Sequence, residues 1–375
     1  MEGDLIWPDA FLQSPVQESG GGRWPVSGRL RIGLVPPLWA PIPPKTYGGI
    51  ELVVHLLTEE LVRGGHDVTL YGTGDSTTKA RLVPVCERNM LDYMAATEAY
   101  VYEAYANAAV ARVMAQAADC DVLHFHIGMH WMPFAALLKT PCLFTIHTFA
   151  SYDDRWLARN SPGVTLAGIS HYQAAALEEG TGRRIPVVHN GCDFGAFSPR
   201  EEAGRYLAFL GRMSYDKNPL DAIRIAKAAG MPIILAGRAQ EAKEEAYFEK
   251  EIKPLIDGGQ VRYIGPVNHQ QKQELLRNAA ALLFPIQWAE PFGLVMIEAM
   301  ACGTPVLAHG LGSVAEVVDA GITGYHAPDI AGMGELLPAT LALDRRRVRA
   351  HAEGRFSHRK MVEAYVQLYR ELARG

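Results

Sequence analysis

Short apolar runs alternate with amphipathic stretches along most of this chain. Residues 30–35 (L-R-I-G-L-V) predict a buried strand, residues 49–63 an amphipathic helix, and residues 66–71 (H-D-V-T-L-Y) a second strand. A strand, a helix and a strand in this order form a βαβ unit, and the strands of such a unit are parallel. The pattern therefore predicts a parallel α/β sheet that begins near residue 30.

The same alternation continues and then restarts. Apolar runs at residues 121–126, 142–147 and 164–170 predict further strands of the first sheet. A second series begins with a strand at residues 206–210 and a helix at residues 220–229. Its later strands are predicted at residues 233–236, 261–264, 280–284 and 306–308. We therefore expect two α/β domains, each built on its own sheet.

The length of the chain agrees with two domains. A chain of 375 residues is long for one domain and sufficient for two, each with its own core. We place the first domain at residues 28–198, the second at residues 199–355 and a last helix at residues 356–375. Residues 1–27 show no hydrophobic period, and we expect them to form a flexible N-terminal extension.

The charge balance excludes several kinds of partner. Lys and Arg total 36 against 41 Asp and Glu, a net charge of −5, which gives no bulk attraction to nucleic acid or to an anionic membrane. We expect no nucleic-acid partner and at most peripheral membrane contact. The basic cluster Arg345, Arg346, Arg347 and Arg349 is interpreted as a solvated helix face.

Cysteine content and hydropathy bear on the compartment. The five cysteines follow no metal-ligand spacing and no disulfide framework, which fits a reducing environment. No apolar run approaches the roughly 18 residues of a membrane-spanning helix, and the acidic start M-E-G-D-L is unlike a signal peptide. We therefore expect a cytoplasmic protein.

The most informative stretch is residues 285–305, P-I-Q-W-A-E-P-F-G-L-V-M-I-E-A-M-A-C-G-T-P. A predicted strand leads through a Pro-Phe-Gly turn into a helix, and Gly293 permits a close backbone approach at the turn. The free N–H groups near Leu294 and Val295, with the helix dipole behind them, form an anion site.

Two carboxylates, Glu290 and Glu298, flank this turn. A carboxylate beside bound phosphate can accept hydrogen bonds from sugar hydroxyls, so the two acids are expected to contact different parts of one elongated ligand. The alternative from spacing alone is an ordinary helix with one acid near its N-terminus and one solvated Glu.

Two loops at predicted strand ends carry further candidates. The loop G-R-M-S-Y-D-K-N-P places Arg212 and Lys217 between a strand and a helix, where phosphate ligands lie in open α/β sheets. A pair of solubilising surface cations is the alternative. Residues 36–47 form a proline-rich loop of unusual length before Gly48 and Gly49, which predicts ligand contact there.

Histidines follow two of the predicted strands. His124, His126 and His130 could hold zinc, but no fourth ligand is spaced to complete such a site, so metal is the less favoured interpretation. His147 lies just past the end of its strand and is the stronger candidate for ligand contact. A simple hydrogen-bonded histidine at a strand end is the alternative.

A dinucleotide site is a competing hypothesis. Residues 310–315 (G-L-G-S-V-A) fit the fingerprint G-x-G-x-x-A before a predicted helix. The acid expected at a strand end about 20 residues further on does not stand there. The sequence therefore disfavours a dinucleotide-binding enzyme.

The segment E-P-F-G-L-V-M-I-E-A-M-A-C-G-T-P-V resembles the signature of the family 4 glycosyltransferases. G-R-x-x-x-x-K, N-G-x-D-x-x-x-F and G-G-I-E at residues 211–217, 190–197 and 48–51 resemble further elements of that family, although Asn218 stands where glycine is common. The resemblance implies the GT-B fold, two Rossmann-like doubly wound domains facing across a cleft. It also implies that the last helix, with its F-S-x-x-x-M-V-x-x-Y pattern, crosses back onto the first domain.

The resemblance also implies roles for the candidate residues. Arg212 and Lys217 would bind the donor pyrophosphate, Glu290 would orient the donor sugar, and His147 would contact that sugar from the other domain. Glu298 would hold the ribose. Backbone near the donor would come from Gly48, Gly49, Gly293, Leu294, Val295 and Val267, the last beside the nucleotide base.

The resulting expectation is a retaining glycosyltransferase that moves a hexose-type sugar from a nucleoside-diphosphate sugar, UDP first and GDP second, to a hydroxyl of an unidentified small-molecule or glycan acceptor. No cofactor and no metal are expected. The alternatives are an epimerase or a phosphorylase on the same fold, or a non-catalytic nucleotide-sugar binding protein. A glycoside hydrolase would also use two carboxylates but would not need Arg212 and Lys217.

Overall fold

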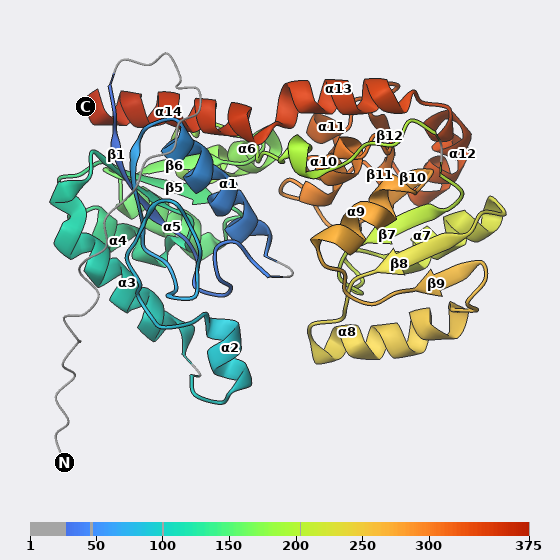
Figure 1. Ribbon diagram of the computed structural model, residues 1–375, viewed down its shortest axis with the longest axis horizontal. Helices are drawn as coiled ribbons and strands as arrows, with labels where there is room; N and C mark the ends of the chain where they lie inside the picture. Colours follow the sequence, from blue (N-terminus) through green and yellow to red (C-terminus); the bar gives the residue numbers. More distant parts are fainter. Residues whose placement is uncertain (1–27, 46–47, 100, 203, 375) are drawn as a thin grey trace.

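The first half of the chain forms a parallel six-stranded sheet. The computed structural model describes residues 28–45, 48–99, 101–202 and 204–374, so the predicted extension at residues 1–27 lies outside the described residues. The sheet has the strand order β3-β2-β1-β4-β5-β6 (Figure 1). Its strands are β1 (Arg31–Val35), β2 (Asp67–Leu70), β3 (Arg81–Leu82), β4 (Val122–Phe125), β5 (Cys142–Ile146) and β6 (Thr165–Gly168).

The second half forms another parallel six-stranded sheet beside the first, in the order β12-β11-β10-β7-β8-β9. Leu207 pairs with Ile233, and Leu282 pairs with both Ala208 and Val306, so β10 lies between β7 and β11. Its strands are β7 (Leu207–Leu210), β8 (Ile233–Ala236), β9 (Val261–Tyr263), β10 (Ala281–Phe284), β11 (Val306–His309) and β12 (Gly324–Ala327). Two doubly wound α/β units are thus confirmed.

Both sheets reverse their winding direction at one point. In the first sheet the chain winds outward from β1 to β3 and then returns to β4 on the other side of β1. In the second it winds outward from β7 to β9 and returns to β10 on the other side of β7. Ligands of open α/β sheets bind at the carboxyl ends of the strands at such switch points. A ligand is therefore expected at the loops after β1, β4, β7 and β10.

Helices cover both faces of each sheet (Figure 1). Several begin at a polar capping residue; for example, the side chain of Asn218 accepts a hydrogen bond from the backbone of Asp221. In the first unit they are α1 (Gly49–Arg63), α2 (Met90–Ala95), α3 (Tyr102–Gln116), α4 (Met132–Ala135), α5 (Tyr152–Asn160) and α6 (His171–Thr181). In the second they are α7 (Pro219–Ala228), α8 (Ala242–Tyr247), α9 (His269–Arg277), α10 (Leu294–Ala301), α11 (Val314–Val317), α12 (Ile330–Leu341) and α13 (Arg345–Phe356). Short 3₁₀ or π segments occur at Ala117–Asp119, Met129–Trp131, Phe194–Ala196, Phe248–Ile252 and Lys253–Leu255.

The last helix, α14 (His358–Arg374), belongs in space to the first unit. It packs against α1 and β4, while α13 just before it packs against α10 of the second unit. Tyr365 and Tyr369 of α14 are fully buried. The chain therefore returns to its first sheet after completing the second.

Both sheets are buried on both faces, which explains why their strands were visible as apolar runs. Along β10, Leu282 and Phe284 belong to one core cluster, whereas Ala281 and Leu283 belong to the cluster on the opposite face. Parallel strands covered by helices on both sides are apolar at nearly every position. The same holds for β1, where Leu34 and Val35 enter different clusters.

The positions of two arginines contradict the predicted solvated helix face at residues 345–349. Arg345 is only 5% exposed, and its guanidinium donates to the carbonyl oxygens of Arg200 and Ala279 at 2.7 Å each. Arg349 likewise donates to the carbonyl oxygen of Phe194 at 2.6 Å. Free carbonyl groups at helix and loop ends need donors, and these two side chains supply them. The prediction of a solvated helix face was wrong for both.

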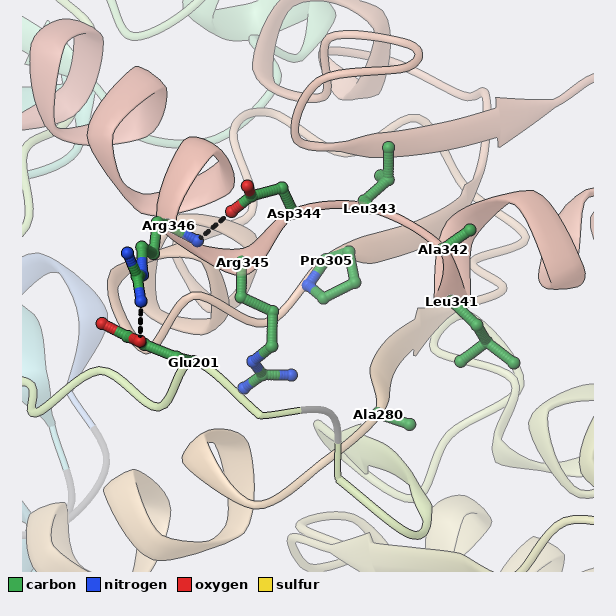
Figure 2. Close-up of a pocket in the computed structure, with 9 residues that line it drawn as sticks. All are labelled: Glu201, Ala280, Pro305, Leu341, Ala342, Leu343, Asp344, Arg345 and Arg346. Atoms are coloured by element: carbon green, nitrogen blue, oxygen red, sulfur yellow. Dashed lines mark hydrogen bonds and ion pairs between the residues drawn. The ribbon is translucent and has the colours of Figure 1, made fainter.

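A cavity of about 350 Å³ lies beside Arg345 (Figure 2). Its lining includes Ala280 and Pro305, the residues just before β10 and β11, so it opens at the amino ends of these strands. This is the end opposite to the one at which α/β sheets bind ligands. The cavity is therefore not the candidate functional site.

Candidate functional site

The centre of the candidate site is an ion pair between the loops that follow β7 and β10. Lys217 Nζ lies 2.5 Å from Glu290 Oε2, and Glu290 is 8% exposed. The indole N–H of Trp288 donates to the same carboxylate oxygen at 3.1 Å, and Lys217 Nζ lies 4.9 Å from the centre of the Trp288 ring. The carboxylate and the ammonium group are thus held in fixed positions at the switch point of the second sheet.

The N-terminus of α10 lies next to this pair. Gly293 precedes the helix with a φ of 81°, in the left-handed region that favours glycine. A Cβ at Gly293 would lie 2.6 Å from Met296 Cε and 3.3 Å from Glu290 Cγ, so Glu290 packs directly against the turn. Gly293 has no side chain to cap the helix, which leaves the N–H groups of the first turn, at Leu294 and Val295, for an anion.

The loop after β11 supports Glu290 from behind. Gly312 forms a bridge with Glu290, and Ser313 N donates to the carbonyl oxygen of Glu290 at 2.9 Å. A Cβ at Gly312 would lie 2.3 Å from Glu290 N. The glycines of the G-x-G-x-x-A pattern therefore allow a close backbone contact. The following helix, α11, has four residues and is too short to hold a dinucleotide by its dipole.

Arg212 follows β7 directly and forms an ion pair with Glu244 of α8. Glu244 is 2% exposed, and its second oxygen accepts a hydrogen bond from Gln240 N at 2.8 Å. Both predicted cations of this loop thus have a carboxylate partner. Sequence reasoning missed Glu244 because it stands 32 positions from Arg212 on a helix that carries several exposed acids.

Glu298 lies further along α10 and is 6% exposed. It forms an ion pair with Lys272 of α9, and Lys272 Nζ lies 5.8 Å from the centre of the Phe197 ring. Glu290 and Glu298 therefore have different cationic partners, in keeping with two acids that contact different parts of a ligand. Neither is the solvated helix residue that spacing alone allowed. Lys272 was also missed, because nothing in the sequence of α9 distinguishes it from a surface lysine.

The first unit presents the N-terminus of α1 to the second. A Cβ at Gly49 would lie 3.4 Å from Leu294 Cδ1, so the first residues of α1 and α10 face each other. A Cβ at Gly48 would lie 2.7 Å from Pro44 Cβ, so the proline-rich loop requires glycine there. Val267, after β9, is half-buried against the core of the second unit.

His147 follows β5 and is half-buried. Its Nε2 lies 2.9 Å from Nδ1 of His126, the residue that follows the neighbouring strand β4. Burial lowers the pKa of His147 to about 4 and the pKa of His126 well below its usual value. Both imidazoles are therefore neutral near pH 7.

The zinc alternative does not hold. His124 Nδ1 lies 2.6 Å from Tyr369 Oη, and its Nε2 lies 2.7 Å from Thr145 Oγ1. Neither ring nitrogen is left for a metal, and His130 is exposed on another segment. Burial also lowers the pKa of His124 well below its usual value.

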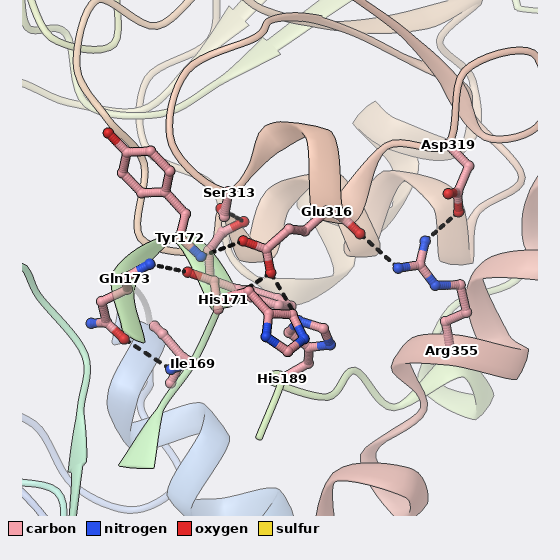
Figure 3. A network of polar contacts seen from close by, with 11 residues as sticks. Ile169, His171, Tyr172, Gln173, His189, Ser313, Glu316, Asp319 and Arg355 are labelled. Atoms are coloured by element: carbon pink, nitrogen blue, oxygen red, sulfur yellow. Dashed lines mark hydrogen bonds and ion pairs between the residues drawn. The ribbon is translucent and has the colours of Figure 1, made fainter. Parts of the chain in front are cut away.

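A second polar cluster joins the two units at Glu316 of α11 (Figure 3). Its carboxylate accepts hydrogen bonds from His171 N at 2.7 Å and Tyr172 N at 2.6 Å, at the N-terminus of α6, and lies 3.2 Å from His189 Nε2. Side-chain ligand atoms of His171, His189 and Glu316 lie within 4.8 Å of one another. Both carboxylate oxygens already accept N–H groups, however, and the positive end of a helix disfavours a cation. The cluster is a contact between the units.

In the described part of the chain, none of the helices combines the length and the apolar character that crossing a bilayer requires.

Comparison with known proteins identifies the class. Residues 47–195 match the family described as Glycosyltransferase Family 4, and residues 196–331 match the family described as Glycosyl transferases group 1. The chain therefore belongs to the group 1 glycosyltransferases of the family 4 type and is a glycosyltransferase with the GT-B fold.

Individual relatives agree with this assignment. The chain is 26% identical over 391 residues to a glycogen synthase of Mycobacterium tuberculosis, covering 89% of this chain and 93% of the relative. It is 30% identical over 221 residues to a D-inositol 3-phosphate glycosyltransferase of Mycobacterium bovis, covering 53% and 46%.

Solved structures show the same fold. AviGT4, a glycosyltransferase involved in avilamycin A biosynthesis, superposes with a TM-score of 0.67 at 26% identity, covering 92% of this chain and 98% of its own. Sucrose-phosphate synthase from Thermosynechococcus elongatus reaches a TM-score of 0.74 at 18% identity, covering 92% and 99%. HepE of Anabaena, in complex with UDP and glucose, reaches 0.70 at 18% identity, covering 92% and 100%.

Proposed function

We propose that this glycosyltransferase moves a hexose from a nucleoside-diphosphate sugar to a hydroxyl acceptor, with retention of configuration and without a metal ion. UDP is the first choice of nucleotide and GDP the second. One observation carries the proposal: the ion pair between Lys217 and the buried Glu290 lies at the switch point of the second sheet, beside the uncapped N-terminus of α10. This arrangement offers a cation and backbone N–H groups to a diphosphate and a carboxylate to a sugar.

The choice of UDP rests on what similar proteins bind. HepE, which shares the fold, has been crystallised with UDP and glucose and with UDP-glucose. The glycogen synthase and the sucrose-phosphate synthase are named for sugar transfer. These names favour a nucleoside-diphosphate hexose as donor for this chain.

The chemistry follows from where charge develops. Breaking the bond between the anomeric carbon and the diphosphate leaves negative charge on phosphate and positive charge on the sugar ring. Lys217, Arg212 and the N–H groups of α10 would stabilise the leaving diphosphate, as a metal ion would in other enzymes. Both side chains are preorganised, because their carboxylate partners Glu290 and Glu244 hold them in place.

Glu290 and Glu298 would position the donor rather than exchange protons with it. The Glu290 carboxylate, fixed by Lys217 and Trp288, would accept hydrogen bonds from sugar hydroxyls. Glu298, fixed by Lys272, would accept them from the ribose. His147 would contact the sugar from the first unit, and contact between the units would limit the access of water, a competing acceptor.

The test is product analysis with a panel of donors. The purified chain is incubated in EDTA with UDP-glucose, UDP-galactose or GDP-mannose and a panel of sugar and polyol acceptors, and products are followed by mass spectrometry and NMR. The proposal predicts release of a nucleoside diphosphate with formation of a glycoside of unchanged anomeric configuration. Formation of sugar phosphate from a glycoside in a parallel incubation with inorganic phosphate would indicate a phosphorylase, and an epimerised sugar an epimerase. Inversion, or activity that EDTA abolishes, would overturn the corresponding part of the proposal.

A further inference from the structure

A buried polar network connects His147 to the last helix of the chain. Tyr369 Oη of α14 lies 2.6 Å from His124 Nδ1, and His124 Nε2 lies 2.7 Å from Thr145 Oγ1 on β5. Thr145 Oγ1 in turn lies 2.9 Å from Tyr365 Oη of α14. These groups are fully buried, and both ring nitrogens of His124 have partners. The ring of His124 is therefore fixed from two sides.

His126 stands between this network and His147. Its side chain is 2% exposed, and its ring centre lies 4.0 Å from that of His124. The ring of Tyr365 lies edge-on at 6.4 Å. His126 Nδ1 lies 2.9 Å from His147 Nε2, while His126 Nε2 is buried and has no hydrogen-bond partner among the described residues. The rings of His124 and Tyr365 thus pack against the His126 ring beside its contact with His147.

The hydrogen bond between two neutral imidazoles has a direction, because each ring carries one N–H group. If His147 donated from Nε2, His126 would carry its proton on Nε2 and bury an N–H group without an acceptor. If His126 donates from Nδ1, its Nε2 is a bare lone pair. A buried N–H without an acceptor is rarer in proteins than an unused acceptor. The second arrangement is therefore favoured.

The direction decides what His147 offers to a ligand. When its Nε2 accepts from His126, the proton of His147 must be on Nδ1. No hydrogen bond joins His147 Nδ1 to any residue in the described ranges, and His147 is the half-exposed member of the pair. The Nδ1–H group of His147 is thus left to donate a hydrogen bond to the substrate.

We propose that His126 is a positioning residue that fixes the Nδ1–H tautomer of His147, so that His147 acts as a hydrogen-bond donor to an oxygen of the donor sugar. The proposal rests on the proposed function, in which His147 contacts that sugar. In this role His147 donates a hydrogen bond that polarises and orients the donor sugar. Neutral His147 then has no free lone pair and cannot act as a general base. The α14 tyrosines contribute by holding His124 and His126 in place.

Two substitutions of His126 separate positioning from packing. In His126→Asn, the side-chain amide places an N–H close to the position of Nδ1 and can still donate to His147 Nε2. In His126→Leu, the ring volume is largely kept and the donor is lost. The matched control is His130→Leu, which changes an exposed histidine of the same unit.

The direct readout is the tautomer of His147, measured by long-range ¹H–¹⁵N NMR on the full chain with labelled histidine. Signals of His147 are assigned by their loss in His147→Gln. We expect the proton on Nδ1 in the wild type and in His126→Asn, and a mixture or the Nε2–H form in His126→Leu. A wild-type spectrum with the proton on Nε2, or an unchanged His147 tautomer in His126→Leu, would overturn the proposal. If His126→Leu does not fold, the wild-type spectrum alone decides.

The kinetic readout uses UDP-glucose as donor with an acceptor identified by the product screen. We expect kcat to fall by at least about tenfold in His126→Leu, as for loss of one substrate hydrogen bond, and to be largely restored in His126→Asn. Equal losses in both variants, at unchanged melting temperature, would contradict a positioning role. If the chain transfers no sugar from any donor while His147 carries Nδ1–H, the proposed function fails and the tautomer assignment stands.

Discussion

At the scale of residues, the charges of the candidate site come in pairs. Lys217 is paired with Glu290, and Lys272 with Glu298. A carboxylate that neutralises Lys217 weakens its attraction for phosphate, so Glu290 is costly for nucleotide binding unless it does something else. The presence of Glu290 is explained if its carboxylate accepts hydrogen bonds from the hydroxyl groups of the sugar.

We predict opposite effects of Glu290→Gln on binding and turnover. The amide keeps the shape of the side chain but frees the charge of Lys217, so UDP should bind as tightly as before or more tightly. Turnover with UDP-glucose should fall by about 10²-fold or more, as when an oriented group at a reacting centre is lost. Calorimetric titration and steady-state kinetics measure the two effects. Glu274→Gln, at an exposed acid of α9, is the control, and a parallel loss of UDP affinity would contradict the account.

The buried histidines predict how stability depends on pH. The pKa of His147 is lowered from 6.5 to about 4, and the pKa values of His124 and His126 are lowered as well. Unfolding therefore takes up protons below pH 6.5, and the free energy of unfolding should fall as the pH drops from 6.5 toward 4. Each such histidine adds up to about 1.4 kcal/mol per pH unit to the slope, and above pH 6.5 the contribution is flat.

Urea denaturation of the wild type and of His147→Gln at several pH values measures this slope. In His147→Gln, the slope of the free energy of unfolding against pH should be smaller by the contribution of one histidine. The control variant is His130→Leu, at an exposed histidine of the same unit. A free energy of unfolding that is independent of pH between 6.5 and 4.5 would show that these histidines titrate normally.

The sequence identified both partners of the Lys217–Glu290 pair, but only one partner of the Arg212–Glu244 and Glu298–Lys272 pairs. Arg212, Lys217, Glu290, Glu298 and His147 stand at strand ends or inside a recognisable segment, so their positions could be predicted; their roles stay predictions. Glu244 and Lys272 could not be found, because each lies on a helix whose local pattern gives it no distinction. The contact of His126 with His147 depends on how the chain turns after β4 and β5. The alternation of apolar and amphipathic stretches in the sequence does not encode these turns.

At the scale of elements, the strands that could be predicted are those covered on both faces. The runs at β1, β4, β5, β10 and β11 are apolar at nearly every position. The edge strands β3 and β12 were missed. β3 has two residues, and β12 reads G-Y-H-A with both central residues half-buried, so neither presents an apolar run.

The turn before α10 offers a test at this scale. Gly293→Ala places a Cβ in the left-handed region and against Glu290, so we predict a loss of stability of about 1–2 kcal/mol and weaker UDP binding. The matched control is Gly334→Ala in α12, where a Cβ meets nothing within 4 Å. In a helix interior that change should stabilise by about 0.5–1 kcal/mol. Urea denaturation measures the stability of both variants, and UDP titration measures their affinity. Unchanged UDP affinity in Gly293→Ala would show that the turn is not part of the UDP-binding site.

At the scale of the whole molecule, long-range contacts join the two units. The helix α14 returns to the first sheet, and Glu316 of the second unit binds the N-terminus of α6 in the first. The division into two α/β units could be predicted, because the strand and helix rhythm restarts within a chain of sufficient length. The Glu316 contact could not, because it joins residues 145 positions apart.

We predict that Glu316→Ala loosens the contact between the units. A carboxylate at a helix N-terminus contributes about 1–2 kcal/mol, so the melting temperature should fall by a few degrees. The apparent KM for UDP-glucose should rise, because fewer molecules hold both halves of the site together. Calorimetry, small-angle X-ray scattering and kinetics measure these effects. Glu335→Ala, at an exposed acid of α12, is the control; equal behaviour of the two variants would show that Glu316 does not couple the units.

Lys217 and the N-terminus of α10 are proposed to bind a nucleoside diphosphate without a metal. Thermal unfolding in EDTA, with and without UDP, tests this binding most directly, because a ligand that binds the folded state raises the melting temperature. We predict that UDP raises the melting temperature of the wild type and of Lys227→Ala, a change at an exposed lysine of α7, but not of Lys217→Ala. No shift with UDP, GDP, ADP or dTDP, or an equal shift in Lys217→Ala, would contradict the account.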